Sequence, residues 1–91
     1  MKEVWKYQLE ACSVQVVNMP EGAQILKIEN QHEIPCLWAL VNPIAPVEQR
    51  KILIRGTGHS INQENIKFIS TFQVDNGNFV FHTFEEVNDD R

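Results

Sequence analysis

The strongest constraint on the fold is a pair of β-prone runs near the end of the sequence, joined by a short polar turn. Residues 66–74 and 79–85 are rich in aromatic and β-branched side chains, which favour strands. The four residues between them are Asp75-Asn76-Gly77-Asn78. An Asn76-Gly77 centre readily adopts the two positive φ angles of a type I′ turn. The sequence therefore predicts an antiparallel C-terminal hairpin with this turn at its tip. Its expected register pairs Val74 with Phe79, Phe72 with Phe81 and Ser70 with Thr83.

Shorter runs in the rest of the chain carry the same signal. In residues 3–9, Trp5, Tyr7 and Leu9 alternate with polar residues, and a period of two indicates a strand with one buried face. Residues 34–41 are apolar at almost every position, which is typical of a central strand. Further strands are expected over residues 13–17, 23–29 and 51–55. The sequence thus predicts an all-β fold, a small antiparallel β-sandwich or barrel of six to seven short strands.

The length of 91 residues is enough for one domain. We assign residues 1–86 to a single β domain and residues 87–91 to a flexible acidic tail. The acidic residues near the end are expected to lie in solvent with this tail: Glu85, Glu86, Asp89 and Asp90. A domain of this size buries only about two-thirds of the surface that its unfolded chain exposes, so its stability is marginal. Oligomerisation is a common remedy, and we expect a homo-oligomer.

The charge balance restricts the partners. The chain has 12 acidic and 8 basic residues and a formal net charge of −4, whereas a protein that wraps duplex DNA needs clustered Lys and Arg. No apolar run reaches the roughly 18 residues that span a bilayer. The first seven residues interleave charges with apolar residues, unlike a signal peptide. We therefore expect no duplex nucleic acid or membrane as partner, a cytoplasmic location, and reduced Cys12 and Cys36.

The densest group of polar side chains lies where the strand at 51–55 meets two glycines. Backbone N–H groups in a glycine turn can point toward one centre and hold an anion, and Arg55 can bind a phosphate through two nitrogens. Trp5 and Tyr7 are rings that can stack on a base. The predicted ligand-binding residues are Arg55, Gly56, Thr57, Gly58, His59, Ser60, Trp5 and Tyr7. The alternative is a plain turn with Arg55 in solvent and both rings in the core.

The chain lacks the spacing patterns of a metal or catalytic site. A metal site would draw on His32, His59, His82, Cys12 and Cys36. None of their separations matches a zinc motif, so neither a metal nor a cofactor is expected. A hydrolase needs a nucleophile, a base and an orienting acid, and Thr57 or Ser60 beside His59 lacks the acid. We expect a protein that is not an enzyme, and a phosphoesterase that uses His59 is the weaker alternative.

Five motifs are spread over residues 3–84. They are Val4-Trp5-Lys6-Tyr7, Met19-Pro20-Glu21-Gly22-Ala23, Pro35-Cys36-Leu37-Trp38-Ala39-Leu40-Val41, Gly56-Thr57-Gly58-His59 and Phe79-Val80-Phe81-His82. In this order they resemble a family of small proteins of unknown function encoded by bacteriophages and prophages. The resemblance implies a phage-derived accessory protein that is made inside a bacterium, and it brings no activity with it.

Two functions follow as expectations. The first is a binding protein that sequesters a small anionic ligand of the nucleotide type, such as a second messenger of host defence. This function needs a cation for phosphate and rings for bases, and it needs no catalytic groups. The second is a protein-interaction module that binds a host or virion protein through a sheet edge or through the face of residues 34–41.

Overall fold

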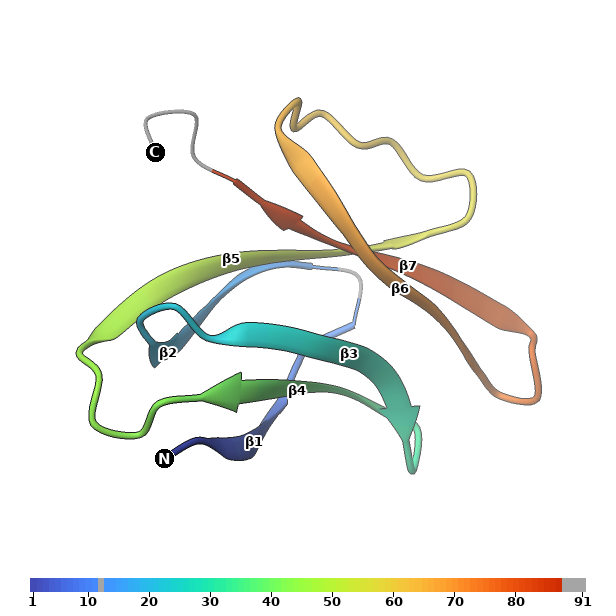
Figure 1. Ribbon diagram of the computed structural model, residues 1–91. Coiled ribbons are helices and arrows are strands. Elements are labelled where there is room, and N and C mark those ends of the chain that lie inside the picture. Colours follow the sequence, from blue (N-terminus) through green and yellow to red (C-terminus); the bar gives the residue numbers. More distant parts are fainter. Residues whose placement is uncertain (12, 88–91) are drawn as a thin grey trace.

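Figure 1 shows the computed structural model of the chain, which describes residues 1–11 and 13–87. The regular structure of these residues consists of seven β-strands. The strands are β1 (Glu3–Gln8), β2 (Val14–Pro20), β3 (Gln24–Gln31), β4 (Ile34–Val41), β5 (Val47–Gly56), β6 (Ile66–Val74) and β7 (Phe79–Glu86). The all-β prediction is confirmed, with the larger of the expected strand numbers. Cys12 and the predicted acidic tail beyond Val87 lie outside the described residues.

The strands form two antiparallel sheets that pack as a small sandwich (Figure 1). The three-stranded sheet has the order β1-β4-β3, and the four-stranded sheet has the order β2-β5-β7-β6. Period-two alternation turns every second side chain of each strand toward the other sheet. The buried cluster comprises Leu9, Val17, Met19, Ala23, Ile28, Leu37, Ala39, Val41, Ile52, Ile54 and Phe72. We call the face of each sheet that is turned away from this cluster its outer face.

The C-terminal hairpin has the predicted register. Phe72 lies opposite Phe81, and their ring centroids are 5.6 Å apart. The turn is wider than a two-residue tip, because φ is positive at Asp75 as well as at Asn76 and Gly77. Two backbone hydrogen bonds, Gly77 N–H to Val74 O and Asn78 N–H to Asp75 O, close it. The Asn76-Gly77 pair therefore predicted the position of the hairpin correctly, but it did not predict the positive φ angle of Asp75.

Along one side of the sandwich, the hydroxyl of Ser70 forms the hydrogen bonds that backbone groups form between paired strands. β3 and β6 are the edge strands of their sheets and lie side by side. The Ser70 hydroxyl of β6 donates to Ile28 O of β3 at 2.5 Å and accepts from Ile28 N–H at 3.3 Å. Asn30 Nδ2 donates to Gln73 O at 3.0 Å on the same side. The fold is therefore a sandwich whose two sheets are joined along one side, which makes it intermediate between the predicted sandwich and the predicted barrel.

The segment that connects β5 to β6 crosses the outer face of the four-stranded sheet. Both strands are antiparallel to β7 and lie on either side of it, so residues 57–65 must cross β7 to return. They run on the side of the sheet away from β3 and β4 (yellow in Figure 1). Leu53 has an outer-face position in β5 and is nevertheless 0% exposed. An outer-face side chain of the central strand can therefore be buried in this fold.

The prediction that Glu85 lies in solvent is wrong. Glu85 belongs to β7 and is 8% exposed. Its carboxylate pairs with Nε and Nη2 of Arg50, while Nη1 of Arg50 donates to Ala23 O at 2.9 Å. This hydrogen bonding raises the pKa of Arg50 and keeps the guanidinium charged. The cation that makes burial possible comes from β5, 35 residues earlier, so no local pattern indicates it.

Candidate functional site

Three polar side chains form a row across the outer face of the four-stranded sheet. Arg55 of β5 lies directly opposite His82 of β7, and His82 lies opposite Thr71 of β6. Their neighbours Ile54 and Phe72 point into the buried cluster, so the three side chains point outward. The row therefore brings together residues from three strands that are far apart in the sequence.

His82 is the centre of this row. Its Nε2 lies 2.7 Å from Oγ1 of Thr57, and its Nδ1 lies 3.1 Å from Oγ1 of Thr71. A neutral imidazole has one N–H donor and one acceptor nitrogen, so one threonine hydroxyl accepts a hydrogen bond from the ring N–H and the other donates one to the second ring nitrogen. The ring is half-buried, whereas both threonines are exposed. The hydrogen bonds hold two hydroxyls and an imidazole in a fixed arrangement at the surface.

The glycine turn continues β5 and lies against β7. Thr57 N–H donates to Val80 O at 3.3 Å, and His59 N–H donates to Gly56 O at 3.1 Å. Gly58 has a φ of 87°, which strongly favours glycine. A Cβ on Gly56 would lie 3.0 Å from Cε1 of His59, so the imidazole of His59 packs directly over Gly56. The two glycines are thus required for different reasons, one for its backbone angle and one for this ring.

Arg55 connects the turn to the crossover segment. Its Nε donates to Ser60 O at 3.2 Å, and its Nη1 donates to Ile54 O at 3.1 Å. The side chain is half-buried, and Nη2 has no hydrogen-bond partner among the residues that the structure describes. Arg55 is therefore held in place by two carbonyl groups through its other two nitrogens.

An apolar row lies beside the polar one. Leu53, Phe84 and Phe68 lie opposite one another on β5, β7 and β6. Phe68 is 57% exposed, and its ring meets that of Phe84 edge to face, with centroids 5.8 Å apart. Residues two positions apart on a strand are separated by about 7 Å, so the apolar row lies about that distance from the polar row. The outer face of the four-stranded sheet thus carries both a polar row and an exposed aromatic ring.

A family model matches the whole chain, residues 1–91, and its description is "Domain of unknown function (DUF7352)". The chain belongs to the DUF7352 family. No curated protein and no solved structure matches it. Membership of the DUF7352 family supplies no activity, so the function has to be argued from the residues of the site.

The structure of this DUF7352 domain separates the two predicted aromatic residues from the glycine turn. Trp5 and Tyr7 belong to the three-stranded sheet and pack against the buried cluster, whereas Arg55 is on the outer face of the other sheet. The Tyr7 hydroxyl is buried without a partner in the described part of the chain, and this burial raises the pKa of Tyr7. Trp5 Nε1 donates to Glu3 Oε1 at 2.8 Å. The exposed aromatic ring beside the polar row is that of Phe68.

Of the predicted residues, those of one turn lie together: Arg55, Gly56, Thr57, Gly58, His59 and Ser60. His82 and Thr71 were not among the predicted residues. The signal was present, because the predicted register of the C-terminal hairpin places these two residues opposite each other. What the sequence does not reveal is that β5 pairs with β7, which adds Arg55 and Thr57.

Over residues 1–11 and 13–87, the structure has no group of three or more His, Cys, Asp or Glu side chains that could hold a metal ion. The described part of the chain also contains no helix with the length and apolar character of a membrane span.

Proposed function

We propose that this DUF7352 protein is a non-enzymatic binding protein that holds a small anionic ligand of the nucleotide type on the outer face of its four-stranded sheet. The observation that carries the proposal is the row of Arg55, His82 and Thr71, with Thr57 hydrogen-bonded to His82 at 2.7 Å. A fixed cation beside a hydroxyl donor suits a phosphate group. The exposed ring of Phe68 suits a base, since stacking on an aromatic side chain is available to every base.

Each group has a separate task in this proposal. Nη2 of Arg55 binds a phosphate oxygen, and the threonine hydroxyl that accepts the His82 N–H donates to another. The backbone of Gly58 and the ring of His59 border the phosphate on the side of the turn, with Ser60 next to it. A base extends toward Phe68. Charge-assisted hydrogen bonds of this kind are about twice as strong as neutral ones, so the Arg55 contact is expected to dominate the affinity.

We extend the proposal to a biological role. The protein acts in the cytoplasm of a bacterium as a phage accessory protein, and it sequesters a nucleotide second messenger of host defence. The support is the motif resemblance to phage and prophage proteins, together with a site that offers binding groups and no acid to orient its histidine. Sequestration requires that the ligand stays intact, which distinguishes it from hydrolysis by a phosphoesterase.

Calorimetric titration with cyclic dinucleotides, cyclic trinucleotides and cyclic ADP-ribose isomers tests the proposal. At least one member of this panel should bind, and Arg55→Gln should weaken that binding by about 10-fold or more. Lys27→Gln, on the other sheet, is the control and should leave it unchanged. Denaturing the complex should release the ligand intact. Absence of heat across the panel contradicts the binding function, and released hydrolysis products would favour the phosphoesterase.

A protein-interaction function is the second candidate, and the outer face of the three-stranded sheet favours it. Trp38 and Leu40 of β4 are half-buried there, and Val4 of β1 and Ile34 of β4 are 57% and 40% exposed. Among the residues that the structure describes, no second sheet covers this face. The partner would be a host or virion protein, or a second copy in a homo-oligomer.

Light scattering and co-purification from a bacterial lysate test this second function. A dimer or larger assembly that Val4→Asp converts to monomers would support a homo-oligomer. A stoichiometric host or virion protein that the same variant loses would support a heterologous partner. A monomer that retains no protein from the lysate would contradict both.

A further inference from the structure

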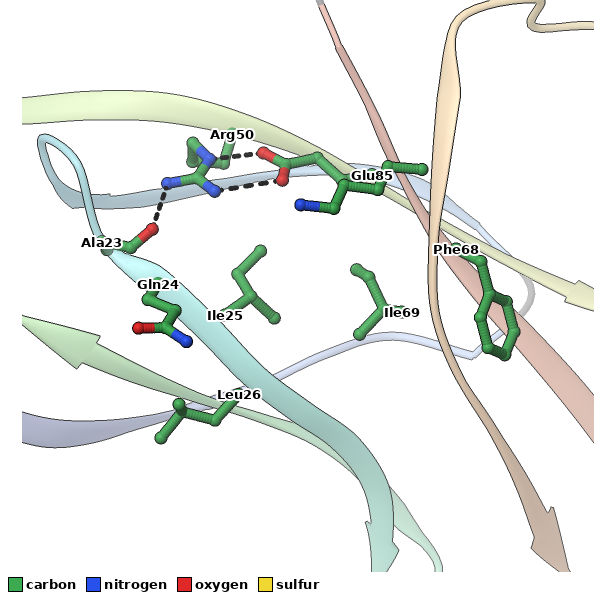
Figure 2. Close-up of a pocket in the computed structure, with 9 residues that line it drawn as sticks. Ala23, Gln24, Ile25, Leu26, Arg50, Phe68, Ile69 and Glu85 are labelled. Atoms are coloured by element: carbon green, nitrogen blue, oxygen red, sulfur yellow. Dashed lines mark hydrogen bonds and ion pairs between the residues drawn. The ribbon is translucent and has the colours of Figure 1, made fainter.

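A cavity of about 250 Å³ lies between the beginning of β3 and the beginning of β6, away from the glycine turn (Figure 2). Its lining comprises Ala23, Gln24, Ile25, Leu26, Arg50, Lys67, Phe68, Ile69 and Glu85. An engineered protein cavity of about 150 Å³ is enough to bind benzene. The space is therefore large enough for a small organic molecule.

Two β-bulges face this cavity. The pairing of β3 with β4 shifts between Ile25 and Lys27, and the pairing of β6 with β7 shifts between Phe68 and Ser70. A bulge bends its strand and increases the local twist. The two strands are joined at Ser70 and Ile28, and the cavity lies on the bulged side of this junction. The opening is thus built into the pairing of both strands.

One wall of the cavity is charged but electrically balanced. Arg50 and Glu85 form a two-point ion pair, and each side chain is only 10% exposed. The remaining contacts of Arg50 go to Ala23 O and, at 3.5 Å, to Glu48. Figure 2 shows the guanidinium placed between Ala23 and Glu85. A ligand therefore meets a pair whose charges already compensate each other.

Lys67 supplies the uncompensated charge of the lining. It lies opposite Glu85 in the β6–β7 pairing and is exposed, yet it forms no ion pair within the part of the chain that the structure describes. Each of the two strands also contributes an isoleucine, and Figure 2 shows the side chains of Ile25 and Ile69 pointing toward each other across the space. The cavity thus combines one available cation with an aliphatic clamp.

We propose that this cavity binds a small organic carboxylate with a short aliphatic or aromatic body. Its carboxylate contacts Lys67 beside the Arg50–Glu85 pair, and its body lies between Ile25 and Ile69. An amine of the same shape would meet Lys67 with like charge and would find Glu85 already engaged by Arg50. A neutral amide would forgo the charge-assisted bond to Lys67. The cavity shares Phe68 with the proposed nucleotide site on the outer face, but Lys67, Ile25 and Ile69, which carry the present proposal, have no part in that site.

An NMR titration with three matched probes tests this proposal. Hexanoate, hexylamine and hexanamide share one aliphatic body and differ in charge, and phenylacetate tests an aromatic body. We expect hexanoate to shift the backbone amides of residues 24–27 and 67–69, with an affinity about 10-fold or more above that of the amine and the amide. Lys67→Gln should remove this preference, whereas Lys27→Gln and Arg55→Gln should retain it.

Two variants distinguish binding in the cavity from a failure to fold. Lys67 is exposed, so its glutamine variant is expected to fold, and its amide spectrum verifies this before titration. Ile69→Phe, which fills the aliphatic clamp, should abolish the shifts if its spectrum shows a folded domain. The proposal is overturned if hexanoate and phenylacetate produce no shifts, if the shifts map outside the cavity, if hexylamine binds as well as hexanoate, or if Lys67→Gln binds hexanoate unchanged.

Discussion

Oγ1 of Thr57 lies 2.7 Å from Nε2 of His82, although 25 residues separate them in the sequence. This contact attaches the exposed glycine turn to the surface of the four-stranded sheet. Because His82 also meets Thr71 and lies opposite Arg55, the register of three strands sets the positions of the polar groups. A site positioned by sheet register is more rigid than one carried by a loop alone, which lowers the entropy cost of binding.

The buried Arg50–Glu85 ion pair is expected to contribute far more to stability than the neighbouring Lys51–Glu86 ion pair on the outer face. Glu85→Gln leaves the buried Arg50 charge without its carboxylate, which costs about 3–5 kcal/mol in the free energy of unfolding. Glu86→Gln is the matched control, because Glu86 pairs with Lys51 at 3.4 Å across two partly exposed side chains and such pairs contribute about 1 kcal/mol or less. Urea unfolding measures both. Equal losses in the two variants would contradict the structure of this charge cluster.

The Ser70 hydroxyl is expected to hold β3 and β6 together. Ser70→Ala removes the bonds to both Ile28 N and Ile28 O, leaving backbone groups of a buried strand position unpaired at a cost of about 1–3 kcal/mol. Thr71→Ala changes the next hydroxyl along the strand, which is exposed, and should cost less than the Ser70 change. Hydrogen exchange at Ile28 should accelerate in Ser70→Ala alone. Unchanged exchange there would show that the junction does not depend on this hydroxyl.

Burial of Tyr7 predicts a loss of stability at alkaline pH. Burial raises the pKa of Tyr7 above its usual 10.0, so the unfolded chain loses the proton first. The free energy of unfolding should therefore be unaffected below pH 10 and should fall above it. Tyr7 is the single tyrosine of the chain, so tyrosinate absorbance reports its pKa directly. Tyr7→Phe should abolish this part of the alkaline loss, and a pKa at or below 10.0 would contradict the burial of the hydroxyl.

The β3–β4 hairpin contains backbone strain that one substitution should relieve. Its two turn residues, His32 and Glu33, have φ angles of 53° and 67°, a region that Asn tolerates better than His. His32→Asn is expected to raise the free energy of unfolding by about 0.5–1 kcal/mol. The same change at His59, where φ is not positive, should give no such gain. Thermal unfolding of the two variants measures the difference, and an equal effect would exclude backbone strain as the cause.

The sequence predicts local pairing well and the direction of side chains less well. The register of the C-terminal hairpin follows from its turn and its β-prone runs, and both are local signals. A period of two shows that Trp5 and Tyr7 share a face, but it does not show whether that face points inward. Their packing against the core depends on the contact between two sheets, which no single run reveals.

For the same reason, only part of the candidate site could be predicted from the sequence. Arg55, Thr57 and His59 stand together in the sequence and attract notice as a group. His82 joins them because β5 pairs with β7, a contact between segments about 25 residues apart. The burial of Glu85 has the same origin, since Arg50 lies on that same neighbouring strand. Long-range strand order, rather than local propensity, decides both.

An NMR titration with 5′-AMP, which carries one phosphate and one base, tests the central claim most directly. The account predicts shifts of the amides of residues 57–60, of the His82 imidazole and of the Phe68 ring, together with an affinity that falls about 10-fold or more in Arg55→Gln. Arg55→Lys keeps the charge without the planar guanidinium and should lie between the two. No shifts, shifts centred on Trp5 and Tyr7, or equal affinity in the wild type and Arg55→Gln would contradict it.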